Sequence, residues 1–197
     1  MEPSDLNLRP AEILELEFKY ASQTAAQSQN DRTIVVNLYL FLVGGVGSLA
    51  LGLLQSSSTN ALQIPRAGYA LLFALLACSG FFTMFKLVRL RQAWHDSALA
   101  MNRIKDYYLE KFPELASAFR WRTDSIPAPG KPFTISFNLV LLVAIVDSLM
   151  LAAAMNFMGV RITLGEYVVE TFTALLYFAW QIWFYFFQLP VGAKETK

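Results

Sequence analysis

Apolar residues are gathered into long blocks that are almost free of charge. Residues 34–54 contain no charged side chain, and residues 67–85 form a second such block after Pro65, which suits a helix start because proline lacks an N–H. Residues 137–158 contain one acidic residue, and residues 167–189 contain another near their start. Each block reaches the roughly 20 residues that a helix needs to cross about 30 Å of hydrocarbon. The pattern therefore predicts four transmembrane helices.

The composition agrees with this pattern. Of 197 residues, 55% are hydrophobic and 16% are charged, which is unlike the balance of an ordinary soluble domain. The single cysteine, Cys78, excludes disulfide frameworks and cysteine zinc sites. The net charge of +1 gives no electrostatic argument for binding nucleic acid. We therefore expect an all-α, four-helix integral membrane protein with cytosolic helical extensions.

Lysine and arginine are unequally distributed between the segments that join the blocks. Residues 1–33 contain three and residues 86–132 contain nine, whereas residues 55–66 and 159–166 contain one each. Because cytoplasmic segments of membrane proteins are enriched in these residues, we expect both termini, including residues 190–197, in the cytoplasm. The acidic opening of the chain does not resemble a cleavable signal, so the first span is expected to direct insertion.

Two amphipathic segments extend the first hairpin beyond the membrane. Apolar residues recur at spacings of three and four through residues 86–112, and no helix breaker occurs before Pro113. A second stripe follows Pro10 and continues into the first span. We expect these stripes to pack against each other or against other subunits, because an isolated apolar stripe would stay hydrated. Residues 125–132 contain three prolines and are expected to form a stiff connector.

The expected organisation therefore has five parts. They are an amino-terminal helix, a transmembrane hairpin, a stalk with its connector, a second hairpin and a tail: residues 1–33, 34–85, 86–132, 133–189 and 190–197.

Asp147 lies about halfway along the third block. An ionised carboxylate facing lipid there would cost on the order of a few kcal/mol, so Asp147 is expected to face protein or water. It lies either on an ion path or in a contact that locks helices together. Three polar residues of the first hairpin are candidate partners: Asn37, Tyr39 and Thr83. Glu166 and Glu170 are expected at the outer membrane surface, opposite the cytosolic segments. They form either an acidic ring in an oligomer or an ordinary solvated helix start.

Small residues at intervals of four mark two candidate packing faces. The strip in the first block consists of Gly44, Ser48 and Gly52. The strip in the third block consists of Ala144, Ser148 and Ala152. Such strips allow close approach of helix backbones, either within one chain or between subunits.

Basic residues near aromatic rings are candidates for binding a nucleotide. The set is Arg103, Lys105, Arg120, Trp121 and Arg122. Cations beside an aromatic ring suit phosphates and a stacked base, although solvated charges on a helical hairpin explain the same pattern. Lys86, Arg89 and Arg91, at the inner membrane edge, are explained by the positive-inside bias and anionic lipid. No phosphate loop, nucleophile elbow or metal-ligand pair is found, so we expect no enzyme, metal or cofactor.

The order of segments resembles a known family. A polar amphipathic helix, residues 12–21, continues through residues 27–30 into a glycine-bearing span, and the second span continues into the basic stalk of residues 86–91. This architecture, over roughly the first 120 residues, resembles the SLATT-type small membrane proteins of bacterial antiphage systems and is similar to the four-span channel effector of the Hailong defence system. No ligand residue can be transferred from the family, because the resemblance contains no diagnostic motif.

The resemblance implies a homo-oligomeric, most simply tetrameric, effector of the bacterial inner membrane. It also implies a neighbouring nucleotidyltransferase or other sensor, a nucleotide or oligonucleotide that controls the effector, and an opening that collapses the membrane potential. The interpretation that we favour is a channel gated through its cytosolic helices, with Asp147 or the outer acidic residues favouring cations. The alternative is a non-conducting tetraspan scaffold in which Asp147 pairs helices.

Overall fold

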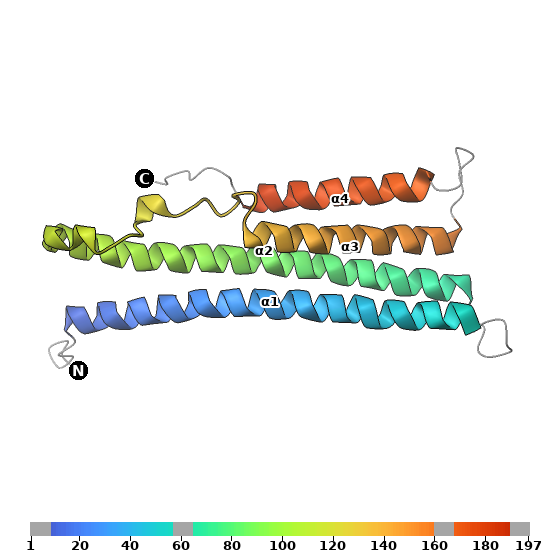
Figure 1. Ribbon diagram of the computed structural model, residues 1–197, viewed down its shortest axis with the longest axis horizontal. Coiled ribbons are helices and arrows are strands. Elements are labelled where there is room, and N and C mark those ends of the chain that lie inside the picture. The colour runs from blue at the N-terminus through green and yellow to red at the C-terminus, as the bar shows by residue number, and fades with distance from the viewer. Residues whose placement is uncertain (1–8, 57–64, 160–167, 190–197) are drawn as a thin grey trace, which may run out of the picture.

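The computed structural model describes residues 9–56, 65–159 and 168–189. In these residues the chain is helical apart from short connections, and no strand is present. Four α-helices account for most of it (Figure 1): α1 Pro10–Ser56, α2 Arg66–Lys111, α3 Ile135–Met158 and α4 Val168–Gln188. The expected all-α class is confirmed.

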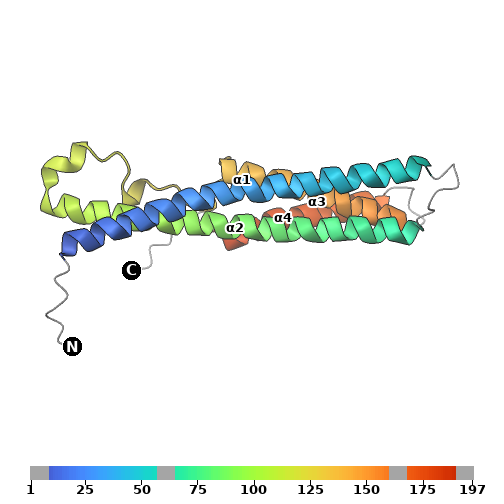
Figure 2. The same cartoon turned by 90° about the horizontal axis from the view of Figure 1, so that it is seen from below.

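The first two helices are much longer than a membrane is thick. α1 has 47 residues and α2 has 46, so each is about 70 Å long, against about 30 Å of hydrocarbon. They run antiparallel, and α3 and α4 lie beside only one end of this pair (Figure 1). The other end projects as a two-helix stalk (Figure 2). Both helices pass unbroken from the stalk into their apolar halves, in agreement with the lack of a breaker before Pro113.

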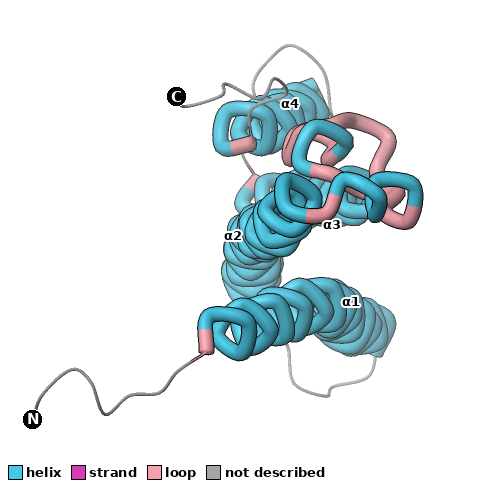
Figure 3. Tube along the Cα trace, turned by 90° about the vertical axis from the view of Figure 1, so that its left-hand side faces the viewer, coloured by secondary structure: helices cyan, strands magenta, loops and turns pink. Residues whose placement is uncertain are grey.

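The helices form an open array in which α2 is central. α1 packs on one side of α2, α3 packs on another, and α4 packs on α3 (Figure 3). Two apolar cores result. The core nearer the stalk joins all four helices through Val36, Tyr39, Met84, Leu87, Val88, Val140, Val143, Tyr185 and Leu189. The core at the far end joins α1, α2 and α3 through Ala50, Tyr69, Phe73, Leu76 and Ala154.

Local sequence explains where the helices begin and end. Pro65 has extended backbone angles and caps the start of α2, and Pro113 prevents α2 from continuing. The Thr134 hydroxyl accepts a hydrogen bond from Phe137 N at 3.2 Å and caps the start of α3. Gly159 ends α3 with a left-handed backbone (φ 69°), which glycine adopts without steric cost.

Three of the described helices are long and apolar enough to cross a membrane: α1, α2 and α3. By length and composition the protein is therefore a helical membrane protein. α4 is not among these helices, although it has 21 residues. Its sequence includes Glu170 and Gln181 together with tryptophan and tyrosine, whose polar atoms lower its mean hydropathy.

The stalk buries one apolar stripe of α1 against α2. Ala21 and Ala25 are buried, and Leu14 and Phe18 are half-buried. The stripes of the two stalk helices therefore meet within one chain, which is one of the two arrangements that the sequence allows. A second row of α1 residues stays exposed on the stalk: Ile13, Leu16 and Tyr20.

The connector between α2 and α3 folds back along the stalk. Its two short 3-10 helices, η2 Pro113–Ser117 and η3 Thr123–Ser125, both contact α2. Asp106 of α2 accepts a hydrogen bond from the Thr123 hydroxyl and pairs with Arg122 at 3.5 Å. The connector is thereby held against the helix that precedes it.

Candidate functional site

Asp147 lies at the point where all four helices meet. Its side chain is fully buried on α3. Tyr177 of α4 donates a hydrogen bond from its hydroxyl to Asp147 Oδ2 at 3.0 Å. Gln181, one turn further along α4, also interacts with this carboxyl group, while Tyr39 of α1 and Gly80 of α2 lie against it. We call these five residues the Asp147 cluster.

Gly80 allows the close approach of α2 to the carboxyl group. A Cβ added at Gly80 would overlap Cγ and Oδ1 of Asp147 and would lie 2.7 Å from the Tyr39 hydroxyl oxygen. Any side chain larger than hydrogen must therefore displace buried atoms. Next to Asp147, Ala144 and Ser148 are buried, so this strip of small residues lies in the crowded helix crossing that the sequence predicts. Ala152, the third member of the strip, is half-buried.

The cluster contains more polar atoms than its hydrogen bonds satisfy. Asp147 Oδ1, the Tyr39 hydroxyl and both amide atoms of Gln181 are buried without a hydrogen-bond partner among the described residues. Gln181 interacts with Asp147, but in a geometry too poor for a hydrogen bond. Buried polar groups are usually hydrogen-bonded, and intramembrane carboxyl groups are enriched at functional sites. The cluster is therefore the strongest candidate site in the described part of the chain.

Only one of the partners suggested for Asp147 lies beside it. Tyr39 belongs to the cluster, whereas Asn37 is exposed and the Thr83 hydroxyl donates to Ser79 O at 2.9 Å within α2. Sequence reasoning missed Tyr177 and Gln181. Their spacing of four places them on one face of α4, and this was the signal that could have identified them.

The outer acidic candidates do not join the cluster. Glu166 lies outside the described residues. Glu170 is half-buried in the first turn of α4 and makes no ion pair with any residue that the structure describes.

The candidate nucleotide-binding residues are dispersed over the far part of the stalk. Arg122 pairs with Asp106, and Lys105 donates to the Asn102 side chain at 3.1 Å. The Arg120 guanidinium lies 5.7 Å from the centre of the exposed Trp121 ring. Arg103 is exposed. Arg120 therefore lies beside Trp121, as a nucleotide site would need, whereas the charge of Arg122 is already neutralised by Asp106.

The glycine strip of α1 faces away from the other helices. Gly44, Ser48 and Gly52 are exposed, and a Cβ added at Gly44 would meet nothing within 4 Å. Among the described residues, packing of Gly44 and Ser48 against another span of the same chain, one of the two arrangements considered from sequence, is not seen. Its role as a contact between subunits stays a prediction.

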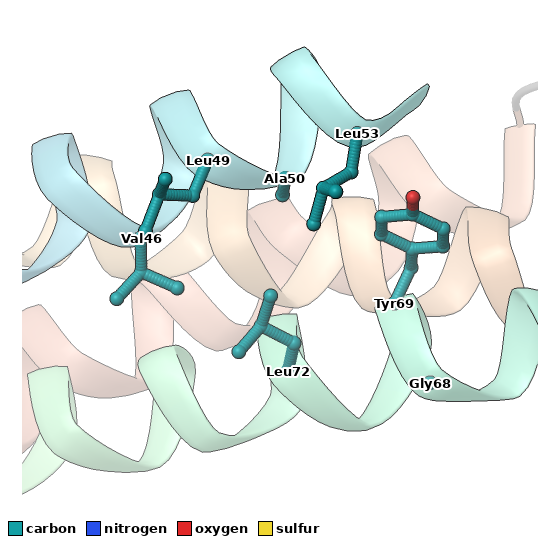
Figure 4. Close-up of a pocket in the computed structure, with 7 residues that line it drawn as sticks. All are labelled: Val46, Leu49, Ala50, Leu53, Gly68, Tyr69 and Leu72. Atoms are coloured by element: carbon teal, nitrogen blue, oxygen red, sulfur yellow. The ribbon is translucent and has the colours of Figure 1, made fainter. Parts of the chain in front are cut away.

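A cavity of about 330 Å³ lies between α1 and α2 at the end away from the stalk (Figure 4). Its lining is almost entirely apolar and consists of Val46, Leu49, Ala50, Leu53, Gly68, Tyr69 and Leu72. The described residues also contain no group of histidine, cysteine or acidic side chains that could hold a metal ion. The cavity offers packing volume but no reactive group.

The fold and the cluster define a class of protein: a helical membrane protein with a buried carboxyl group at the crossing of its helices. Comparison with known proteins adds nothing to this definition, since no family model, no curated protein and no solved structure matches the chain.

Proposed function

We propose that this protein is a homo-oligomeric ion channel of the bacterial inner membrane that is gated through its cytosolic stalk. The observation that supports it best is the fully buried Asp147, hydrogen-bonded by Tyr177 where four helices meet. The resemblance to SLATT-type effectors extends the proposal: a nucleotide-type signal opens the channel during infection, and depolarisation stops growth.

The long helices α1 and α2 connect the stalk mechanically to the Asp147 cluster. Tyr39 lies on α1 and Gly80 on α2, and both helices continue without a break into the stalk. A ligand that shifts α1 against α2 in the stalk therefore changes the surroundings of Asp147. Two packings of a helix bundle can differ by only a few kcal/mol, so the differential affinity of a ligand for them can select one. The packed cluster corresponds to the closed state.

In this proposal α4 is the fourth span, because it runs antiparallel to α3 along the same apolar layer. Both termini are then cytoplasmic. In a Cys78→Ser background, Ser22→Cys on the stalk is expected to react with a membrane-impermeant maleimide only after the cell is opened. Met158→Cys, at the far end of α3, is expected to react from outside. Labelling of both positions from the same side would contradict the first three spans. Thr196→Cys in the tail tests the fourth span and is expected to react only after the cell is opened, so its labelling from outside would contradict four spans.

The oligomer is proposed to form through the outward face of α1. Only 17% of the apolar window of α1 is buried within the chain, against 39% for α2. Gly44, which has no neighbour within 4 Å of its Cβ position, permits close approach of another helix there.

The channel is tested by measuring membrane potential in bacteria that express the protein at matched abundance. Wild type is expected to depolarise the cells when its signal is present, during infection, and Asp147→Asn is expected to lower the conductance of the purified, reconstituted protein in its open state by roughly tenfold, because a carboxylate concentrates cations. Asp96→Asn, the same change at an exposed position on the stalk, is expected to have a much smaller effect. Absence of conductance from correctly assembled protein under every ligand condition would overturn the proposal.

A second candidate function is a scaffold without a pore. The Tyr177–Asp147 hydrogen bond and the close fit of Gly80 favour it, since both are what a helix-pairing contact needs. In a scaffold, Asp147→Asn changes thermal stability or assembly and leaves the membrane potential of the cells undisturbed. Conductance of the reconstituted protein across ligand conditions, measured together with its thermal stability, therefore separates the two functions.

A further inference from the structure

Two arginines are enclosed where the stalk meets the apolar layer. Arg91 of α2 is only 7% exposed, and Arg32 of α1 is half-buried. Arg32 Nη1 donates to the Ser136 hydroxyl oxygen at 2.6 Å, and Arg91 Nε donates to Pro129 O at 3.1 Å. The Arg91 guanidinium also lies 4.6 Å from the centre of the Trp94 ring. Four segments of the chain thus converge on two cations.

Neither cation has a carboxylate partner among the described residues. The ion pairs found there involve other side chains, and Asp31, next to Arg32 in sequence, pairs with neither arginine. Arg32 Nε is buried without a hydrogen-bond partner. Burial lowers the pKa of both guanidinium groups; at Arg91 the nearby Tyr185 hydroxyl opposes this lowering, and the charge of Arg32 adds to it. Buried arginines are normally paired with an anion, so this pair lacks its counter-charge.

The pair lies at one end of the apolar layer. Arg32 precedes the uncharged run that begins at Ile34, and its partner Ser136 is in the first turn of α3, whose N-terminus adds positive potential. Gln92 donates to Gln188 O at 3.1 Å, which brings the end of α4 to the same level. Lipid headgroups occupy this level of a membrane.

We propose that Arg32 and Arg91 bind the phosphate group of an anionic phospholipid in the leaflet on the stalk side. The planar guanidinium fork matches phosphate geometry, and the Nη–H groups that are not committed to Ser136 supply the donors, since Arg91 Nε is bonded to Pro129 and Arg32 Nε is buried. Lys86 and Arg89 differ from this pair, since both are exposed on α2. Lys86 and Arg89 contact lipid headgroups without selectivity, whereas Arg32 and Arg91 bind one anionic phospholipid. This inference does not depend on the proposed channel.

The test is native mass spectrometry of the full chain in detergent, titrated with phosphatidylglycerol. Wild type is expected to retain this lipid more tightly than phosphatidylcholine of the same acyl chains, whose choline offsets the phosphate charge. The double variant Arg32→Gln/Arg91→Gln is expected to lose about tenfold in affinity. The matched control Lys86→Gln/Arg89→Gln removes the same charge at the same level from exposed positions and is expected to lose less than about twofold.

The other outcomes overturn the proposal. Equal losses in the two double variants would mean general surface charge, and equal retention of the two lipids would mean no headgroup recognition. Displacement of phosphatidylglycerol by millimolar inorganic phosphate or ATP would assign the pair to a soluble phosphate instead. Should the double variant elute as misfolded protein, Arg32→Gln and Arg91→Lys answer the same question singly, because Arg91→Lys keeps the charge and removes the fork.

Discussion

Gly80→Ala is expected to lower the free energy of unfolding by about 2 kcal/mol, although alanine is the better helix former. The added methyl group would overlap the Asp147 carboxyl group and press on the Tyr39 hydroxyl, and both are buried. The measurement is reversible unfolding of the purified protein in mixed detergent micelles. Gly45→Ala is the matched control: nothing lies within 4 Å of its Cβ position, so it is expected to stabilise the protein by about 0.5 to 1 kcal/mol.

The source of the cost can be located with a second substitution. Asp147→Ala removes the overlapping atoms, so Gly80→Ala is expected to cost much less in that background. Tyr39→Phe removes only the hydroxyl and is expected to recover a smaller part of the loss. If Gly80→Ala proved as harmless as Gly45→Ala in the wild-type protein, the close contact between α2 and Asp147 would be wrong.

The helices themselves could be predicted because their signals are local. Uncharged blocks of about 20 residues, stripes at spacings of three and four, and breakers such as Pro65, Pro113 and Gly159 determine where helices form. The same signals predicted that α2 continues into the stalk until Pro113. The α4 region gave a weaker signal, since its polar and aromatic residues dilute its hydropathy, and it does not qualify as a span by composition.

The cluster could be predicted only in part, because its partners depend on how each helix is rotated. Asp147 was expected to avoid lipid on energetic grounds, and it is buried. Which residues face it depends on tertiary packing: Asn37 and Tyr39 are two residues apart on α1, yet only Tyr39 points inward. Gly80 belongs to no repeating pattern of small residues, so its contact with Asp147 could not be predicted. The regular strip that includes Gly44, a predicted packing face, faces outward.

The pair of Arg32 and Arg91 could not be predicted from sequence either, because it also depends on tertiary packing. In the sequence, Arg32 counts only toward the orientation of the chain, and Arg91 is one of three basic residues at the membrane edge. No feature of the neighbouring sequence distinguishes Arg91 from Arg89, although Arg91 is buried and Arg89 is exposed. The connector makes the difference, because Pro129, distant in sequence, folds over Arg91 and accepts its hydrogen bond.

Tyr177→Phe is expected to lower the free energy of unfolding by about 2 kcal/mol, because it leaves the buried Asp147 carboxyl group without a hydrogen bond. Tyr39→Phe is the control, since the Tyr39 hydroxyl has no hydrogen-bond partner in the described chain, and it is expected to change stability by less than about 0.5 kcal/mol. The same unfolding assay measures both. Equal effects of the two substitutions would contradict the specific role of Tyr177.

Tyr177→Phe also bears on gating, because the hydrogen bond from Tyr177 to Asp147 holds α4 to α3 in the packed state. A loss of about 2 kcal/mol from the closed packing alone would raise the open fraction of a two-state channel by roughly thirtyfold while that fraction is small. Tyr177→Phe is therefore expected to conduct without its signal, and Tyr39→Phe to stay closed. A scaffold would show the loss of stability without conductance, so stability and conductance measured on the same variant distinguish a gate from a helix-pairing contact.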